Sequence, residues 1–516
     1  MFDPISLAIL AILFFSAYHF YMFRKLKGSD NDVPLDIKLN LPPSPPTFPI
    51  LGNIHQLSPL LHQSFYELSK TYGPVMLLRF FKKPMLIVSC VEMATHILKT
   101  HDSIFLDRLT SKSIKLIFYN GCDIALAPYG ERWKKLRKFC VLEMLSMKRV
   151  QSFKFIRQEE VDKVIENITR SSLERQTINL TEIIFALANS VIFRCSLGDN
   201  FKKDYADRFS ELMMKATSMV MDSFAFEDFF PRLKWMDTLT GYNRKLKRTF
   251  QELDSFFDQI IDDYLLSPLH VDHGYQDHKD DKRNFIDLLD AETDNLGLSR
   301  NNIKGVILDM FVAGSHTTAA ITEWTMSELI KNPKIMKKAQ EEVRSVVGNK
   351  TRVEEKDINQ MNYLKCVVKE TLRLHAPVPT VVRMNSSDSV KIGGYDIPSN
   401  TGIFINIWAI QRNPKYWDKP EEFCPERFES NPIDFKGQDF EFIPFGSGRR
   451  GCPGVSFGLA VVELLVANLL YRFDWKLPGG ASYEDLDMSE DFGMGTCNRK
   501  IHLHVIPTLF HPAASS

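Results

Sequence analysis

The chain has 516 residues, of which 44% are hydrophobic and 25% charged, a composition typical of folded globular proteins. Lys plus Arg and Asp plus Glu number 64 each, a balance that argues against a strongly basic nucleic-acid-binding protein. None of the eight cysteines is spaced as a CxxC pair, so neither a zinc site nor a thioredoxin-type motif is expected, and most cysteines are interpreted as buried apolar side chains in a reducing compartment.

The N-terminal segment predicts a membrane anchor. Residues 4–23 are twenty mostly apolar residues, about 30 Å long as a helix. Arg24, Lys25 and Lys27 follow at once, whereas a cleaved signal peptide carries its positive charge before the apolar run. We therefore predict a single span with its basic stop-transfer signal over 1–27 and the rest of the chain in the cytosol. No other segment looks long and apolar enough to span.

A linker and Pro-rich hinge are expected over 28–49, because the prolines of "LPPSPPTFP" fix φ and disfavour helix and strand. One catalytic body then occupies 50–516. Its first clear element is a strand over 81–90, where β-branched residues follow a turn.

The body is predicted to be mainly α with small β-sheet regions (α+β), one near its start and one of short strands over 380–405. Ser299 can cap the longest helix, and Asn332-Pro333 ends it. A loop over 267–284 holds three histidines among Asp and Lys residues, which we interpret as solvated rather than metal-binding. Helical spacing is found over 129–145, 155–170, 180–198, 246–266, 300–331, 335–348 and 361–375.

The most specific stretch is "FIPFGSGRRGCPG" at 442–454. It places Cys452 in a glycine-rich loop just before a helix, where exposed N–H groups favour a thiolate. Its glycines allow the backbone to approach a flat or bulky group, and Arg449 and Arg450 offer positive charge for carboxylates. The pattern indicates a metal-bound thiolate beside an acidic cofactor.

This stretch resembles the haem-thiolate signature of the cytochrome P450 monooxygenases, and the resemblance extends from the Pro-rich hinge to the C-terminal strands. It implies the cytochrome P450 fold and a haem b cofactor. By the resemblance, Cys452 is the axial ligand of the haem iron and Arg450 meets a propionate. The other signature positions are Phe445, Gly448 and Gly454.

Further motifs follow the order of the family. "KETLR" supplies Glu370 and Arg373 on one helix face, and with Arg427 of "FCPERF" they are similar to the family's structural triad. Trp133 and Arg137 of "ERWKKLRK" match a pattern whose members bind the propionates. Arg383 matches a third propionate contact.

"AGSHTT" at 313–318 is similar to the family's distal-helix motif. The resemblance implies that Ala313 and Gly314 let the helix lie against the haem and that the Thr317 hydroxyl helps to hold dioxygen. His316 stands where the family has an acid that relays protons. Three interpretations are open: His316 relays protons itself, water does so beside it, or the reaction is an oxidative ring closure or rearrangement rather than a hydroxylation. A role as iron ligand is disfavoured, because His316 is rotated about 100° from Thr317.

The resemblance is greatest to plant A-type members, although Gln411 departs from their usual glycine. It implies a single-pass protein of the endoplasmic reticulum membrane that takes electrons from an NADPH-cytochrome P450 reductase and oxidises an apolar terpenoid, alkaloid or phenolic, with Val378, Val381 and Val382 near the substrate. No nucleic-acid partner is expected. Three alternatives to a hydroxylating monooxygenase are open. The enzyme could catalyse an oxidative ring closure, desaturation or rearrangement, it could be a reductase-independent hydroperoxide isomerase or dehydratase, or the protein could be a haem-binding scaffold. By analogy the pocket is lined by residues near 107–125, 216–230, 309–317, 378–382 and 492–496.

Overall fold

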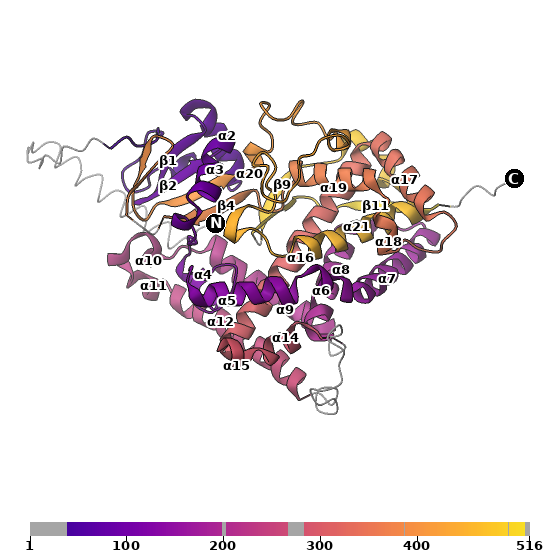
Figure 1. Ribbon diagram of the computed structural model, residues 1–516, viewed down its shortest axis with the longest axis horizontal. Coiled ribbons are helices and arrows are strands. Elements are labelled where there is room, and N and C mark those ends of the chain that lie inside the picture. The colour runs from indigo at the N-terminus through magenta and orange to yellow at the C-terminus, as the bar shows by residue number, and fades with distance from the viewer. Residues whose placement is uncertain (1–38, 199–202, 267–282, 386–387, 494, 511–516) are drawn as a thin grey trace, which may run out of the picture.

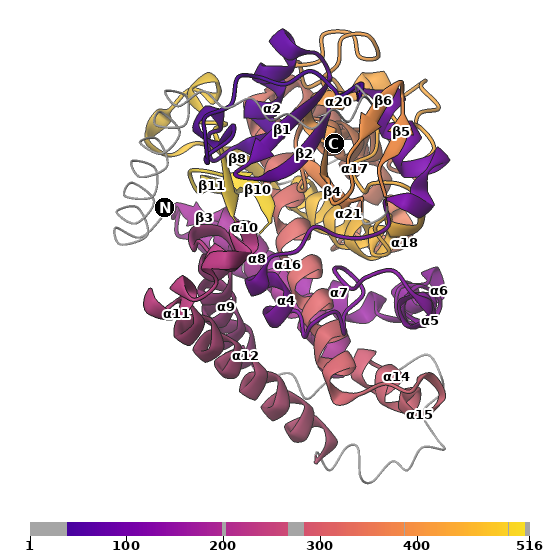
Figure 2. The same ribbon diagram turned by 90° about the vertical axis from the view of Figure 1, so that its left-hand side faces the viewer.

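A computed structural model describes residues 39–198, 203–266, 283–385, 388–493 and 495–510. The predicted anchor, the first half of the linker and hinge segment and most of the histidine-containing loop lie outside these residues. The mainly helical body predicted from the sequence is confirmed (Figures 1 and 2). Its α-helices are α2 (Leu61–Tyr72), α3 (Val91–Thr95), α4 (Lys112–Ile117), α5 (Glu131–Phe139), α6 (Met147–Ser152), α7 (Lys154–Leu173), α8 (Leu180–Leu197), α9 (Lys203–Thr217), α10 (Phe226–Phe229), α11 (Met236–Leu239), α12 (Tyr242–Leu265), α14 (Phe285–Ala291), α15 (Thr293–Leu296), α16 (Arg300–Lys331), α17 (Pro333–Val347), α18 (Glu355–Ile358), α19 (Asn362–Leu374), α20 (Ile407–Ile410) and α21 (Val455–Arg472).

The longest helix, α16, has the predicted limits. Asn302 accepts the backbone N–H of Ser299 at 3.0 Å and so closes the first turn, and the helix stops at Asn332 before Pro333. α16 runs from the helical end of the molecule into its middle (Figure 2). It shares one large apolar core with α8 and α21.

The two predicted sheet regions join into one sheet of order β1-β2-β7-β4. Here β2 pairs with β7 in parallel, with Met85 opposite Gly402, although more than 300 residues separate them. Alternate side chains enter two separate apolar clusters on the two faces of the sheet. Its strands are β1 (Val75–Phe80), β2 (Lys83–Val88), β4 (Thr380–Met384) and β7 (Gly402–Asn406).

The remaining strands form small sheets, most of them from the C-terminal part of the chain. They are β3 (Ile178–Asn179), β8 (Phe473–Lys476) and β11 (His504–Leu509) in one sheet, β5 (Val390–Ile392) with β6 (Tyr395–Ile397), and β9 (Glu490–Gly493) with β10 (Thr496–Arg499). Local patterning did not predict the β9–β10 hairpin, whose strands have only four residues each.

The Pro-rich segment lies against the body without forming a helix or strand over 39–47. Pro43 accepts the backbone N–H of Leu77, and Asn53 Nδ2 donates to the carbonyls of Pro45 and Pro46. The segment is therefore fastened to the body through its carbonyl groups.

Two helices correct the expectation that only the N-terminus is long and apolar enough to cross a membrane. Among the described residues, α8 and α21 also pass on length and hydropathy, but 61% of each is buried inside the molecule. We therefore assign both to the protein core.

Candidate haem-thiolate site

The loop before α21 presents Cys452 on a constrained backbone. The Cys452 N–H donates to the carbonyl of Phe445 at 2.9 Å, so that the two ends of the signature meet. Gly448 has φ +72°, and a Cβ there would lie 2.6 Å from the Leu98 carbonyl oxygen. Any larger residue at 448 would therefore push the loop away from the segment that packs on it.

The Cys452 side chain is exposed on one side, whereas the other described cysteines are half-buried or buried. Packing on its remaining sides raises the pKa of the thiol, while the Gly454 N–H and the Arg137 guanidinium act in the opposite direction. A metal bound at the open side would displace the thiol proton. The donor is therefore suited to a metal centre.

The distal-helix motif divides between two faces of α16. Ala313 is exposed, and the Thr317 hydroxyl donates to the Ala313 carbonyl at 2.6 Å. One residue further on, Thr318 Oγ1 lies 3.6 Å from where a Cβ on Gly458 would be. The helix that follows Cys452 therefore crosses α16 directly beside the motif.

Gly314 has a different environment from the predicted one. A Cβ at this position would lie 2.9 Å from two carbon atoms of the Ile192 side chain on α8. Because helix axes approach closely only where side chains are small, Gly314 serves the packing of α8 on α16. Ala313 is the small residue on the open side.

His316 packs against α8 as well. Its ring lies 4.9 Å from the Phe185 ring, centroid to centroid. Burial lowers the pKa of the imidazole to about 4, so the ring is neutral near pH 7. It then offers one hydrogen-bond donor and one acceptor.

A cluster of four guanidinium groups, from Arg108, Arg137, Arg383 and Arg450, lies beside this region. Burial and the repulsion of Arg450 and Arg137 lower the pKa of Arg108 to about 10, and burial and Arg137 lower that of Arg450 to about 10. Burial, and to a smaller extent repulsion by Arg108 and Arg450, lowers the pKa of Arg383 well below its ordinary value. Within the described part of the chain, none of the four makes an ion pair with a carboxylate.

The hydrogen bonds of these arginines show which N–H groups are still available. Arg450 is held by the carbonyls of Leu106 and Ala127, at 3.0 and 2.5 Å. Arg383 is 1% exposed and donates one hydrogen bond, to the Val382 carbonyl at 3.2 Å, while its Nε has no partner. Arg137 Nη2 donates to the Gly451 carbonyl. Buried and half-buried cations that make no ion pair among the described residues fit the two propionates of a haem.

Trp133, for which a propionate contact is predicted, also contacts the protein around it. Its single N–H donates to the Ile124 carbonyl at 2.9 Å, and an indole has no other donor. The guanidinium carbon of Arg450 lies 4.0 Å from the indole centroid and that of Arg137 lies 5.4 Å from it. Trp133 therefore orients two of the cations by cation–π contact.

Two buried carboxyl groups near the arginines were not singled out from the sequence. Asp309 Oδ2 accepts the N–H groups of Ile124 and Ala125 at 2.7 and 3.1 Å, so α16 holds this loop. Burial and the charge of Asp123 raise the pKa of Asp309, and burial raises that of Asp123 to about 6. The sequence signal for Asp309 was an acidic residue within the apolar run "VILDMFVAG". Arg108, also not singled out, lies in the range 107–125 that was expected to line the pocket.

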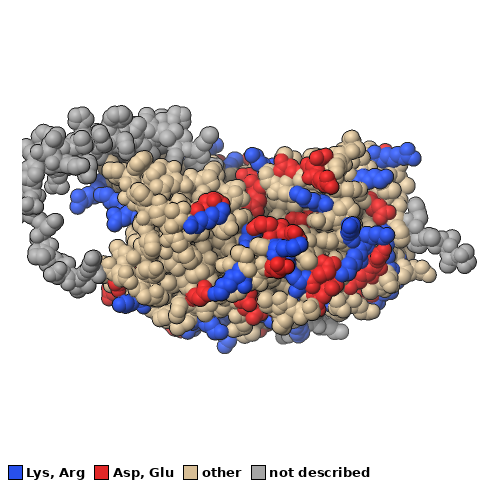
Figure 3. All heavy atoms as spheres, turned by 90° about the horizontal axis from the view of Figure 1, so that it is seen from above, with Lys and Arg blue, Asp and Glu red and all other residues tan. Residues whose placement is uncertain are grey.

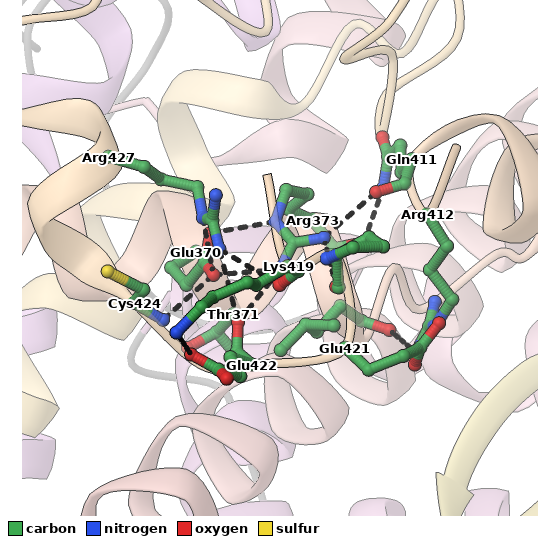
Figure 4. Close-up of polar contacts among 12 residues, drawn as sticks. Glu370, Thr371, Arg373, Gln411, Arg412, Lys419, Glu421, Glu422, Cys424 and Arg427 are labelled. Carbon is green, nitrogen blue, oxygen red and sulfur yellow. Dashed lines mark hydrogen bonds and ion pairs between the residues drawn. The ribbon is translucent and has the colours of Figure 1, made fainter. Parts of the chain in front are cut away.

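Glu370, Arg373 and Arg427 come together on the side of α19 (Figure 4). Glu370 pairs with Arg373 Nε and Nη2, both at 2.8 Å, and with Arg427 Nε at 2.9 Å. The backbone N–H of Cys424 donates to the same carboxylate at 2.9 Å. Gln411, where the motif departs from the family, donates to the carbonyls of Leu372 and Arg373 and so closes the end of α19.

The three valines predicted near the substrate do not share one face. Val378 is exposed. Val381 packs on the sheet face that lies toward the cysteine loop, 3.7 Å from where a Cβ on Gly446 would be, whereas Val382 packs on the opposite face beside Phe404. Strand alternation therefore leaves Val378 and Val381 as the candidates for substrate contact.

Comparison with known proteins gives consistent matches. A model of the cytochrome P450 family matches residues 42–503. Phenylacetaldehyde oxime monooxygenase CYP71AN24 of Prunus mume is 47% identical over 483 residues, covering 92% of this chain and 90% of that protein. Desmethylyatein synthase of Sinopodophyllum hexandrum is 48% identical over 474 residues, covering 91% and 94%. A zebrafish cytochrome P450 solved with progesterone superposes with a TM-score of 0.72 at 23% identity, covering 87% of this chain and 99% of that chain; this match supports the fold.

Proposed function

The chain belongs to the cytochrome P450 family, and from this premise we propose that it is a membrane-anchored haem-thiolate monooxygenase that oxidises an apolar small molecule of plant specialised metabolism, such as a terpenoid, alkaloid or phenolic, with electrons from an NADPH-dependent reductase. One observation carries the proposal. An exposed cysteine sulfur and unpaired arginine cations lie beside one helix motif, and together they match the sulfur ligand and the two acidic groups of a haem.

Each residue has a stated part in holding the cofactor. Cys452 would supply the sulfur ligand, Arg137 and Arg383 have N–H groups available for the propionates, and Arg450 adds charge from a position fixed by Trp133. When bound, the haem supplies the activation of dioxygen, and thiolate ligation favours cleavage of the O–O bond.

The distal helix supplies the groups that handle protons. The Thr317 hydroxyl is held beside Ala313 on the open side of α16, and its lone pairs remain available as acceptors. His316, neutral at physiological pH, can accept a proton at one ring nitrogen and release one from the other. The ring packs on Phe185, and a water molecule could carry a proton between the ring and Thr317.

Partner and membrane assignments follow from the family and from the surface. Lys134, Lys135 and Lys138 are exposed on α5 and offer a basic patch for an acidic redox partner. On the face displayed in Figure 3, Lys and Arg are interspersed with Asp and Glu. The endoplasmic reticulum location rests on the predicted N-terminal anchor.

The departure at His316 favours a second candidate, an oxidative ring closure, desaturation or rearrangement. Product mass distinguishes the two: a gain of one oxygen indicates hydroxylation or epoxidation, whereas loss of two hydrogens indicates desaturation or coupling. The experiment supplies reductase, NADPH and a panel of apolar phenolics, terpenoids and alkaloids. A thiolate-type ferrous–CO spectrum with no NADPH consumption on any substrate would instead support a reductase-independent isomerase.

The role of His316 is tested by His316→Asp, which restores the acid of the family motif. We expect turnover to be kept or raised, because a carboxylate performs the same proton transfer. Complete loss of turnover with an unchanged ferrous–CO spectrum would show that the imidazole has a special role.

A further inference from the structure

A second cluster of metal-binding side chains lies outside the cofactor site. His62 is the second residue of α2, Glu490 the first of β9 and Cys497 the second of β10. One ligand atom from each of them lies within 4.8 Å of the other two. His62 and Glu490 are 428 positions apart, so no spacing motif reveals the cluster.

The three side chains are enclosed by protein. His62 is 2% exposed and Cys497 3%, and the Glu490 side chain is 8% exposed. His62 Nε2 lies 2.9 Å from Glu490 Oε2. A nitrogen, a carboxylate oxygen and a sulfur therefore converge in a region that excludes most solvent, and all three are donors that Zn²⁺ accepts.

Neighbouring groups hold these donors in place, as outer contacts do at metal sites. Gln63 Nε2 donates to Glu490 Oε2 at 2.8 Å, and the Trp408 N–H lies 3.4 Å from Oε1. Asn406 Nδ2 donates to the His62 carbonyl at 2.8 Å. Gln63 and the segment 406–408 therefore position the ligands.

We propose that His62, Glu490 and Cys497 bind one Zn²⁺ ion that fastens the β9–β10 hairpin to α2. Zinc–ligand bonds of about 2.0–2.3 Å require ligand atoms roughly 3–4 Å apart, so shifts of about 1 Å or less bring the cluster to that geometry. Water fills the fourth position. Binding releases the thiol proton of Cys497 to solvent and requires His62 Nε2 to face the ion without a hydrogen, with no change of oxidation state.

The site reaches the active region through the backbone of Cys497. Its N–H donates to the Pro377 carbonyl at 2.8 Å, one residue before Val378. Its carbonyl accepts the Trp324 N–H of α16 at 3.1 Å. Zinc at the cluster therefore restrains the hairpin, the Val378 loop and α16 together, and it changes the KM for substrate rather than the haem spectrum.

The test is a zinc titration of the full-length holoenzyme in competition with a chromophoric chelator, together with zinc-edge X-ray absorption of the loaded wild-type protein. We expect one high-affinity Zn²⁺ per chain with a single sulfur scatterer. Cys497→Ser, Glu490→Gln and His62→Gln each weaken binding at least 100-fold. The control Cys366→Ser, at another buried cysteine on α19, leaves binding unchanged.

A second control replaces His270, His273 and His278 by Gln, because these histidines could also take up zinc. The proposal is overturned if the loaded wild-type protein shows no sulfur scatterer, if the three-histidine variant loses the tight ion, or if no tight ion is found. The absorption measurement needs no substitution, so a variant that fails to fold leaves the test intact. The ferrous–CO spectrum reports separately on the haem site.

Discussion

Two groups of arginines in the described part of the chain, one around Glu370 and one near Cys452, differ in how completely their donors are satisfied. In the group around Glu370, Arg373 uses all five N–H groups, on Glu370 and on the carbonyls of Gln411, Pro420 and Glu422. In the group near Cys452, Arg383 is equally buried but donates a single hydrogen bond, to the neighbouring residue. The first group is complete as the chain folds, whereas the second has charge and donors left over.

The contrast separates a structural network from a binding site. A buried cation without an ion-pair partner is costly, and here two buried and two half-buried guanidinium groups repel one another. Such an arrangement is stabilised when an anion binds. The completed network around Glu370 instead fixes the segment 418–427 and has no donor left for a ligand at Arg373.

The largest effect is expected from breaking the complete network. Glu370→Gln leaves Arg373 and Arg427 without their carboxylate, and an uncompensated buried charge costs about 3–5 kcal/mol. Chemical unfolding followed by circular dichroism should show this loss, with poor yield of folded protein. The matched control is Glu422→Gln, which removes an exposed partner of Lys419 and should change stability little.

A smaller effect, on haem retention rather than on folding, is expected in the group of arginines near Cys452. Arg383→Met removes a cation that makes no ion pair with a carboxylate among the described residues, so helix content should be unchanged while haem is lost faster to an excess of apomyoglobin. A hydrogen bond to a charged group contributes about 1.5–3 kcal/mol, which corresponds to roughly 10–100-fold in rate.

Arg412→Met is the control for that measurement, because Arg412 is also buried but is bonded to the Leu374 carbonyl and stacked on Trp408. It should lower stability without changing haem release. Unchanged haem release in Arg383→Met would show that the unpaired donors serve no cofactor.

The buried acid near the incomplete group predicts a pH effect. Burial raises the pKa of Asp123 from 3.8 to about 6, so its contribution to stability is present below 3.8 and is lost as pH rises to about 6. In Asp123→Asn, the free energy of unfolding should therefore rise more steeply with pH between 4 and 6 than in the wild type. Asp309 interacts with Asp123, so the measurement reports the combined contribution of the two carboxyl groups to the free energy of unfolding.

His316 predicts the opposite sign in an overlapping window. Its pKa falls from 6.5 to about 4 on folding, so its contribution is complete above 6.5 and is lost as pH falls to 4. The stability of His316→Gln should therefore depend less on pH in this range. Identical pH profiles for the wild type and both variants would refute the assignment of these two groups.

Local signals predicted much of the fold. Ser299 and Pro333 set the ends of α16, and the glycine-rich stretch located Cys452 before its helix. What the sequence alone could not show depends on contacts between distant segments. Arg108 reaches the Val382 carbonyl across 274 positions, Gly314 meets Ile192 of α8, and the Trp133 N–H is taken by Ile124. Spacing placed Glu370 and Arg373 on one helix face, but only the family resemblance added Arg427 to them.

The central claim is that the Cys452 sulfur binds the haem iron, and the ferrous–CO difference spectrum tests it most directly. Wild-type protein should show the absorption of a thiolate-ligated haem, and Cys452→Ser should lose that absorption together with turnover. A Cys452→Ser protein that takes up haem with an unaltered spectrum and unaltered turnover would contradict the account.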